Sequence, residues 1–392
     1  MNSALLAVGD PLFAEGVDLT VVLIVILKTL VTFAVLMVAV LFMVWYERKL
    51  VSDMQNRIGP NRAGPFGILQ SLADGIKLFF KEDLLPERAD KRVFRLAPYL
   101  SAVPAFLSFA IVPIGGAVTI AGHETNLQLA DPPVGILWLL AMSGIAVYGV
   151  MLAGWSSGSK YPLLGSVRAS AQMVSYEAAL GLSIATVVLI AGSLSTQAIV
   201  ADQAGEGPFG VLPAWNVLRL GVVPFVIFVI AATAELNRPP FDLVEAEQEL
   251  VGGFHTEYSS IRFALFFLAE FMNTVTMSAI IVTLFLGGPS GPDLGVLPSW
   301  LWPIIWFTAK IFLFLSMYVW FRATLPRLRY DQLMDLGWKL LIPLALFWLL
   351  VIAAVRLDSG YALLSIPAGG LIWLLLGRSM SVSRARTTEK VH

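Results

Sequence analysis

Long apolar runs dominate the sequence and determine how it is organised. A transmembrane helix needs about 20 mostly apolar residues, with a range of roughly 17–25. Nine runs meet this condition, at residues 21–45, 98–120, 133–154, 174–192, 219–236, 262–286, 301–320, 338–355 and 361–377. We therefore predict an all-α polytopic membrane protein with about nine transmembrane helices. No internal repeat is visible, so residues 1–392 are expected to form a single integral membrane domain.

Lysine and arginine are distributed unevenly among the connections between these runs. With the N-terminus outside, 22 of the 26 Lys and Arg residues lie on one side, two on the other, and two within spans. Short cytoplasmic loops carry such an excess of cations. The pattern predicts an N-out/C-in topology, with the basic polar tail 378–392 in the cytoplasm. The N-terminal residues resemble neither a signal nor a transit peptide, which favours a bacterial cell membrane over a mitochondrial one.

Composition excludes several classes of protein. Hydrophobic residues make up 57% of the chain and charged residues only 14%, whereas soluble domains average about 25% charged. The net charge of −1 gives no electrostatic reason to expect nucleic acid as a partner. The chain has no cysteine, which rules out Cys-ligated iron–sulfur or zinc sites in it. Three scattered histidines do not suggest a metal site, so we expect none.

The first long cytoplasmic connection contains an amphipathic segment at about 66–82. Its apolar positions recur at helical spacing, at Phe66, Leu69, Leu72, Ala73, Ile76, Phe79 and Phe80. Its polar positions are Gln70, Asp74, Lys77 and Lys81. Such a helix lies in the membrane interface rather than crossing it. It is either a simple anchor, or, beside Arg57 and Arg62, the mouth of a site for an amphipathic molecule.

The connection 235–261 is acidic, although it lies on the side where cations should dominate. Its acids are Glu235, Asp242, Glu245, Glu247, Glu249 and Glu257, against Arg238 alone. Crowded carboxylates raise one another's pKa, so some of them could exchange protons near neutral pH. The alternative is a solvated acidic face. Arg322, Arg327 and Arg329 in the next cytoplasmic connection are either positive-inside anchors or partners of carboxylates, including those of 235–261.

Ionisable residues also occur within the predicted spans, where each is costly and usually marks a function. Glu270 lies about nine residues into its span, roughly 13 Å from the cytoplasmic end. Glu177 lies near the start of another span, with Arg168 expected in the loop before it. Glu270 and Lys310 are either functional or members of buried structural pairs, and Lys28 is expected to reach towards the outer surface.

Several segments, in this order along residues 40–345, resemble the H-subunit family of NADH-quinone oxidoreductase, to which mitochondrial NADH dehydrogenase subunit 1 belongs. They are Tyr46-Glu47-Arg48-Lys49, Arg57-Ile58-Gly59-Pro60-Asn61, Gln70 to Lys77, Arg168 to Glu177, Glu235 to Asp242, Phe254-His255-Thr256-Glu257-Tyr258, Ala264 to Glu270, and Arg327 to Gln332. The resemblance implies the membrane subunit of respiratory complex I that forms the quinone entry chamber and the first part of the proton-coupling relay.

The same resemblance implies roles for individual residues. The expected quinone-binding residues are Arg48, Asp74, Phe267 and Arg322. The expected proton relay comprises Glu177, Glu235, Asp242, Glu245, Glu247 and Glu270. Structural or ion-pairing roles are expected for Arg57, Arg62, Arg168, Arg238, Arg327 and Arg329. No residue of this chain alone is expected to be catalytic.

The implied substrate is a lipid-soluble quinone, with flavin and iron–sulfur clusters held by partner subunits and no cofactor bound by this chain alone. The implied partners are the peripheral-arm iron–sulfur subunits at the quinone site and other membrane-arm subunits. Two alternatives remain at this stage. One is the equivalent subunit of a sister complex that uses hydrogen or formate. The other is a proton-coupled secondary transporter, against which the absence of repeat symmetry counts.

Overall fold

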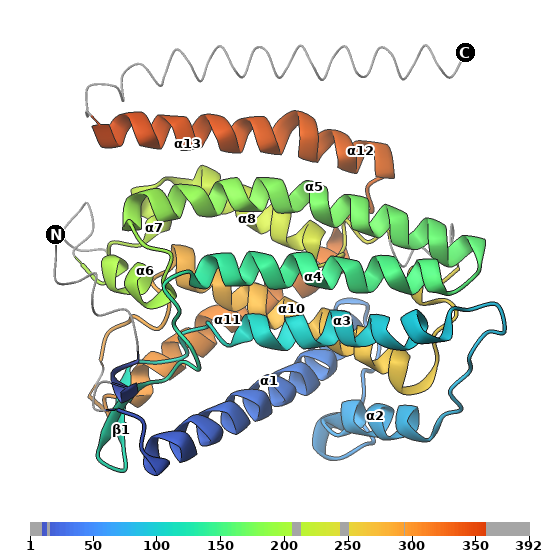
Figure 1. The fold of residues 1–392 in the computed structure, drawn as a ribbon, viewed down its shortest axis with the longest axis horizontal. Coiled ribbons are helices and arrows are strands. Elements are labelled where there is room, and N and C mark those ends of the chain that lie inside the picture. The colour runs from blue at the N-terminus through green and yellow to red at the C-terminus, as the bar shows by residue number, and fades with distance from the viewer. Residues whose placement is uncertain (1–9, 14–15, 206–212, 244–250, 294, 358–392) are drawn as a thin grey trace.

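The computed structural model describes residues 10–13, 16–205, 213–243, 251–293 and 295–357. Glu245, Glu247, the predicted ninth span at 361–377 and the basic tail 378–392 lie outside the described residues. Within the described ranges the chain is mostly helical, as predicted (Figure 1).

Six helical segments are long and apolar enough to cross a membrane. They are α1 (Leu19–Met54), α4 (Gly135–Ser156), α5 (Lys160–Ala191), α10 (Ser260–Phe285), α11 (Leu301–Thr324) and the run Tyr330–Leu357, which joins α12 (Tyr330–Asp335), a π-helical turn (Leu336–Leu341) and α13 (Ile342–Leu357). The bundle also contains α3 (Lys91–Phe109) and the shorter apolar helix α8 (Val222–Glu235). Several long helices, among them α3, α4, α5 and α13, run in nearly the same direction, and α1 and α11 are inclined to them (Figure 1). The count of nine spans and the N-out/C-in topology stay predictions.

Short elements complete the described structure. They are the 3₁₀ turns η2 (Pro11–Phe13), η3 (Pro65–Gly67) and η4 (Gly253–His255), the helices α2 (Gln70–Phe80), α6 (Thr196–Gln203) and α7 (Asn216–Arg219), and the strands β1 (Ala117–Ile120) and β2 (His123–Asn126). The strands pair antiparallel, from Ala117 opposite Asn126 to Ile120 opposite His123. This hairpin and α2 lie at opposite ends of α1 (Figure 1), and we call these ends of the bundle the hairpin end and the α2 end.

Several sequence-based boundaries are wrong. The run 98–120 is a helix only to Phe109, and its last residues form β1. Pro113, Gly115 and Gly116 separate the two, and such residues interrupt helices. Helix α3 also begins earlier, because the Asp90 side chain accepts hydrogen bonds from the first-turn amides of Arg92 and Val93.

The predicted start of α5 is also wrong, because the helix begins at Lys160 rather than near 174. Arg168 therefore lies on a helix instead of in a loop. The physical reason is that an apolar run marks the part of a helix that suits a membrane, whereas the helix itself can continue through polar turns.

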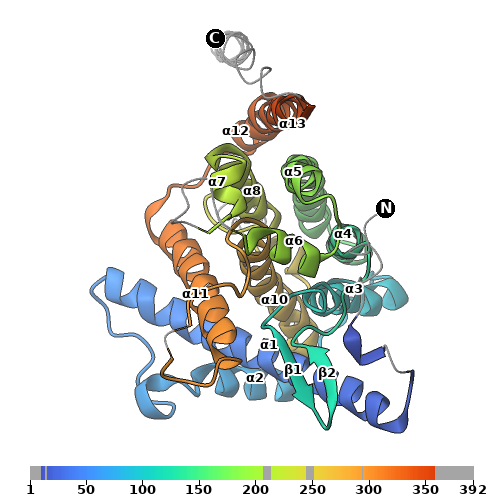
Figure 2. The ribbon, with the colours of Figure 1, turned by 90° about the vertical axis from the view of Figure 1, so that its left-hand side faces the viewer.

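Helix α10 occupies the centre of the bundle, surrounded by the other helices (Figure 2). Of the most apolar window of α10, 72% is buried, compared with 11% for Tyr330–Leu357 at the periphery. Close packing is helped by small residues, as is common between membrane helices. A Cβ atom on Gly149 of α4 would lie 2.8 Å from the Ser101 amide nitrogen of α3. Larger side chains there would force the two helices apart.

Helix α2 confirms the helix predicted within 66–82, and its polar side faces the bundle. Arg48 of α1 forms an ion pair with Asp74 at 2.6 Å, and the Trp45 indole donates to the carbonyl oxygen of Phe66. At the other end of α2, the Ser260 hydroxyl donates to the carbonyl oxygens of Leu78 and Lys81. The apolar positions Leu72, Ile76, Phe79 and Phe80 are exposed. An outward apolar face is what a helix lying in the membrane interface presents to lipid.

Candidate functional site

Four charged side chains from separate elements meet at the α2 end of the bundle. Glu47 of α1 is only 4% exposed, and its carboxylate accepts two hydrogen bonds of 3.0 Å from Arg238. Arg322 of α11 also donates to Glu47. The Nε atom of Arg238 lies 3.0 Å from a carboxylate oxygen of Glu270 on α10. Arg238 thus joins the two glutamates, and we call these four residues the ionic cluster.

The backbone around Arg238 explains its buried position. Helix α8 ends at Glu235, Asn237 has a positive φ of 52°, and Pro239 prevents the helix from continuing. The side-chain amide of Gln172 on α5 donates to the carbonyl oxygens of Ala234 and Phe241, on both sides of this turn. The guanidinium carbon of Arg238 lies 4.4 Å from the centre of the Phe271 ring. Each of these contacts holds the arginine inside the bundle.

A cavity of about 460 Å³ opens beside the ionic cluster, between α1, α10 and α11. It is lined by Val44, Glu47, Arg48, Val51, Ser52, Gln55, Arg57, Ile58, Arg238, Phe267, Glu270, Phe271 and Arg322. We call it the arginine cavity, because four arginines and only two glutamates line it. Its volume is within the range of small-molecule pockets, roughly 300–1,000 Å³. Its excess of positive charge favours an electron-rich or anionic occupant.

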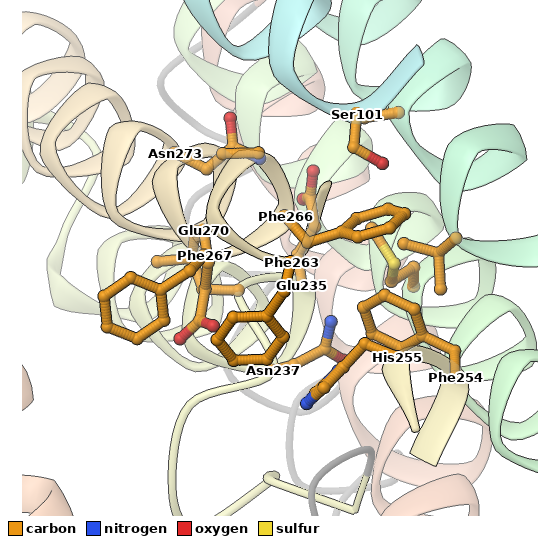
Figure 3. A pocket seen from close by; sticks show the side chains of 15 residues that line it. Ser101, Glu235, Asn237, Phe254, His255, Phe263, Phe266, Phe267, Glu270 and Asn273 are labelled. Atoms are coloured by element: carbon orange, nitrogen blue, oxygen red, sulfur yellow. The ribbon is translucent and has the colours of Figure 1, made fainter. Parts of the chain in front are cut away.

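A second, smaller cavity of about 80 Å³ lies on the other side of Phe267 and Glu270, which line both cavities. We call it the inner cavity. Figure 3 shows its polar side chains, Ser101, Glu235, Asn237, His255, Glu270 and Asn273, among phenylalanine rings. A third cavity, of about 20 Å³, shares Glu235 and Asn273 with the inner cavity. Glu270 and Glu235 therefore each line two successive cavities.

Glu235 is buried, and its carboxylate contacts helix α4. Its Oε1 atom accepts a hydrogen bond from the Ser143 hydroxyl of α4. Its Oε2 atom is buried and has no hydrogen-bond partner among the described residues. A Cβ atom on the neighbouring Gly144 would lie 3.8 Å from a carboxylate oxygen of Glu177. Two acids on α8 and α5 thus pack on adjacent residues of α4.

The loop after α8 is connected to the arginines that follow α11. Arg327 forms an ion pair with Asp242 at 3.0 Å, and the Leu328 amide donates to the carbonyl oxygen of Pro240. Arg327 is therefore a partner of a carboxylate in the connection 235–261, rather than only a positive-inside anchor. Burial lowers the pKa of the His255 imidazole to about 4, although the negative charge of Asp242 opposes this shift.

The structure brings together three of the four predicted quinone-binding residues. Arg48, Phe267 and Arg322 line the arginine cavity, and Asp74 contacts it indirectly through its ion pair with Arg48. Among the predicted relay residues, Glu270 and Glu235 line the inner cavity, whereas Asp242 lies in the adjoining loop. The positions of Glu245 and Glu247 lie outside the described residues.

The predicted structural arginines have different surroundings. Arg57 lines the arginine cavity, while Arg62 is exposed. The Arg168 guanidinium carbon lies 5.4 Å from the centre of the Tyr330 ring. Arg329 pairs locally with Asp331 at 2.6 Å, with both side chains largely exposed. Arg238 and Arg327 form the longer-range pairs already described.

Two buried lysines outside this site have structural contacts. Lys310 donates to the carbonyl oxygens of Leu286, Gly288 and Ser290 at 2.8–3.0 Å, so its contacts lie just beyond the end of α10. Lys28 donates to Asp10 and Thr125 at the hairpin end, with a side chain only 10% exposed. The expectation that Lys28 reaches towards the outer surface stays a prediction, and its amine is paired with the Asp10 carboxylate.

Sequence reasoning did not assign a role to Glu47, His255, Asn237 or Asn273. Glu47 carried a usable signal, since it is a lone acid among cations at the end of an apolar run. The other three have no distinguishing pattern, because only the packing of η4, α8 and α10 directs them to one cavity. Within the described ranges, no group of three or more His, Cys, Asp or Glu residues could hold a metal ion.

Comparison with known proteins gives a consistent result. Residues 27–353 match the family described as NADH dehydrogenase. The chain is 56% identical over 335 residues to the H subunit of NADH-quinone oxidoreductase from Frankia alni, covering 85% of this chain and 72% of the relative. The corresponding protein of Frankia casuarinae is similar to the same extent. That of Streptomyces avermitilis, which bears the same name, is 48% identical over 380 residues, covering 93% of this chain and 82% of the relative.

Proposed function

Since the chain belongs to the H-subunit family of NADH-quinone oxidoreductase, we propose that its arginine cavity receives the quinone headgroup and that Glu270 and Glu235 begin the proton-coupling relay. The chain is a membrane subunit of this oxidoreductase, respiratory complex I. The observation that carries the proposal is the position of Glu270, which lines both the arginine cavity and the inner cavity. The names of the relatives favour this function over a hydrogen- or formate-dependent sister complex or a transporter.

The charge and shape of the arginine cavity support quinone binding. Arg48, Arg57 and Arg322 place guanidinium groups where a quinone carbonyl oxygen could accept hydrogen bonds. Phe267 and Phe271 supply apolar surface for the ring. Helix α2 packs beside α1 and exposes its apolar face on the outside, so this face would guide a hydrophobic tail from lipid towards this end of the bundle.

Quinone reduction changes the charge in this cavity. Quinone takes up two electrons and two protons to become quinol, and negative charge develops on its oxygens before the protons arrive. The excess of arginines stabilises that charge. A negative headgroup also competes with Glu47 and Glu270 for the guanidinium of Arg238, which contacts both acids. Released from Arg238, Glu270 could exchange a proton across the inner cavity, which it also lines.

The remaining acids supply the next steps of the proposed relay. Glu235 lines the far side of the inner cavity, and its buried Oε2 atom faces no hydrogen-bond donor among the described residues. Glu177 packs on Gly144, beside the serine that donates to Glu235. Asp242, Glu245 and Glu247 are proposed to connect the acidic loop to this path. The relay would lead from the quinone towards other membrane-arm subunits.

The wider assembly follows from the same proposal. Flavin and iron–sulfur clusters in partner subunits supply the electrons, which is compatible with the absence of cysteine here. The α2 end, which carries the arginine cavity, would face the cytoplasm and the peripheral-arm subunits. The bacterial relatives and the six apolar helical segments support a membrane location, and we propose the bacterial plasma membrane.

The test is the variant Glu270→Gln in the assembled complex. It keeps the size of the side chain but cannot exchange a proton, so we expect NADH:quinone turnover and proton pumping to fall at least about tenfold. Electron transfer from NADH to ferricyanide, which needs no quinone, should be unchanged. Glu124→Gln, which alters an exposed glutamate on β2, is the matched control. Full pumping by Glu270→Gln would refute the relay.

A further inference from the structure

We infer that His255 is a proton-carrying residue of the inner cavity, passing protons between Asp242 in the loop and the glutamates Glu270 and Glu235. This inference rests on the proposed function and extends its relay by one residue of a different chemical type. It concerns a side chain that is not itself acidic and that lies in a 3₁₀ turn rather than in a membrane helix.

The geometry of η4 directs the imidazole to the inner cavity. His255 lines that cavity together with Glu235 and Glu270 (Figure 3). The rings of Phe254 and Phe263 both lie edge-to-face with the imidazole, and their ring centroids are 4.9 and 5.3 Å from the imidazole centroid. These apolar contacts restrict the ring, and the cavity that it lines also contains the polar groups of Glu235 and Glu270.

The backbone of the turn is fixed by Tyr258. The Tyr258 amide donates to the carbonyl oxygen of His255 at 3.0 Å. The ring of Tyr258 stacks on Phe94 of α3 with centroids 4.0 Å apart, and its hydroxyl donates to the Phe94 carbonyl oxygen. Burial raises the pKa of this hydroxyl to about 12, so it remains a neutral donor. Such fixation keeps the imidazole at one place, as a transfer residue requires.

A neutral imidazole is better suited to passing a proton on than to holding an additional one. With its lowered pKa, His255 is uncharged at neutral pH, so one ring nitrogen carries a proton and the other can accept one. It can take a proton at the unprotonated nitrogen and release the original one from the opposite nitrogen. The ring is then neutral again, and no isolated positive charge remains in a partly apolar site.

Acidic and polar groups from three elements act on the imidazole or share its cavity. Asp242, held by Arg327, acts on it electrostatically from the loop, and Glu235 and Glu270 face the same cavity from α8 and α10. The Asn237 amide also lines the cavity, and its oxygen accepts a hydrogen bond from Gln172. Its amino group is therefore the part available to cavity acceptors. The imidazole thus shares the inner cavity with the two acids of the bundle and is within electrostatic range of the loop acid.

The experiment uses His255→Asn in the assembled complex, with Thr256→Val as the matched control. The control removes a hydroxyl that donates to the Gly253 carbonyl oxygen in the same turn, without removing a titratable group. We expect His255→Asn to lower NADH:quinone turnover and proton pumping about tenfold and to raise the solvent deuterium isotope effect on turnover. A merely structural role would reduce the amount of assembled complex in both variants and leave the isotope effect unchanged.

A second variant keeps the inference testable if His255→Asn assembles poorly. His255→Gly makes space for free imidazole, and addition of imidazole should restore turnover in this variant but not in Thr256→Val. Wild-type turnover and isotope effect in His255→Asn would overturn the inference, as would a lack of rescue in an assembled His255→Gly complex. If Glu270→Gln still abolishes pumping in that case, the proposed function stands without His255. If neither change has an effect, both proposals fail.

Discussion

The two ends of the bundle both bury charged side chains, but they do so in different ways. At the α2 end, Arg238 and Glu47 have side chains 6% and 5% exposed, and at the hairpin end Lys28 and Asp10 are 10% and 11% exposed. The ionic cluster at the α2 end lines the arginine cavity. Asp10, Lys28 and Lys310 line none of the cavities described above.

The partners of these charges account for the difference. Lys310 uses its three donors on three backbone carbonyl oxygens, and Asp10 accepts from Lys28, Thr125 and the Leu12 amide. Such groups have little capacity left for a ligand. Arg238 is instead shared between Glu47 and Glu270, so a change at either acid alters the other. A buried charge therefore indicates function only when its partners are shared and a cavity adjoins it.

The largest effect is expected for Arg238→Met, which would break the ionic cluster at its centre. It leaves the buried Glu47 and the partly exposed Glu270 with less compensation, and removal of one member of a buried pair such as Arg238 and Glu47 costs about 3–5 kcal/mol. We expect little assembled complex on a native gel. Arg329→Met, which breaks an exposed pair worth about 0–1 kcal/mol, is the control. Normal assembly of Arg238→Met would show that the cluster is not a structural centre.

Lys310→Met should have a smaller effect, limited to stability. It removes hydrogen bonds to three carbonyl oxygens next to the end of α10, and unsatisfied buried acceptors cost about 1–3 kcal/mol. The melting temperature of the purified complex should fall. NADH:quinone turnover per assembled complex should be unchanged. A loss of turnover without a loss of stability would contradict the contrast between the two ends.

The smallest effect is expected from titration of Asp10. Burial of its carboxylate raises the pKa, but hydrogen bonds from Lys28, Thr125 and Leu12 and the charge of Lys28 outweigh it, leaving the pKa below 3.8. A lowered pKa stabilises the folded state above the ordinary value and ceases to do so as pH falls through the folded-state pKa. Wild type should melt higher than Asp10→Asn at pH 6, with the difference shrinking as the pH falls below 3.8 and through the lowered folded-state pKa.

Equal melting temperatures of wild type and Asp10→Asn at pH 6 would contradict the structural role of Asp10 and its partners Lys28 and Thr125 at the hairpin end. Turnover should be the same in both proteins at this pH, since Asp10 lines none of the three cavities that form the candidate site. The measurement therefore separates stability from function at the end of the bundle that we regard as purely structural.

Much of the secondary structure could be predicted because it depends on local patterns. The amphipathic spacing at 66–82 predicted α2 at 70–80, and the apolar run 262–286 predicted α10 at 260–285. The predicted boundaries were wrong where an apolar segment is not helical or where a polar segment is helical. Ala117–Ile120 is apolar enough to extend a run but forms β1, and the polar first turns of α5 are helical.

The candidate site was predictable in composition but not in its connections. The sequence alone showed that acids and arginines are concentrated in 235–261 and 322–339, and that Glu270 lies within a span. It also determined the membrane class of the protein, because composition and apolar run length do not depend on tertiary contacts.

Only the tertiary structure decided which charges meet. Glu47 and Arg238 are separated by 191 positions along the chain, yet they share two hydrogen bonds of 3.0 Å. Lys310 and Glu270 were equivalent as buried charges in the sequence, but one contacts carbonyl oxygens and the other Arg238. The physical reason is that electrostatic interactions depend on distance and burial in three dimensions, which the packing of α1, α8, α10 and α11 sets.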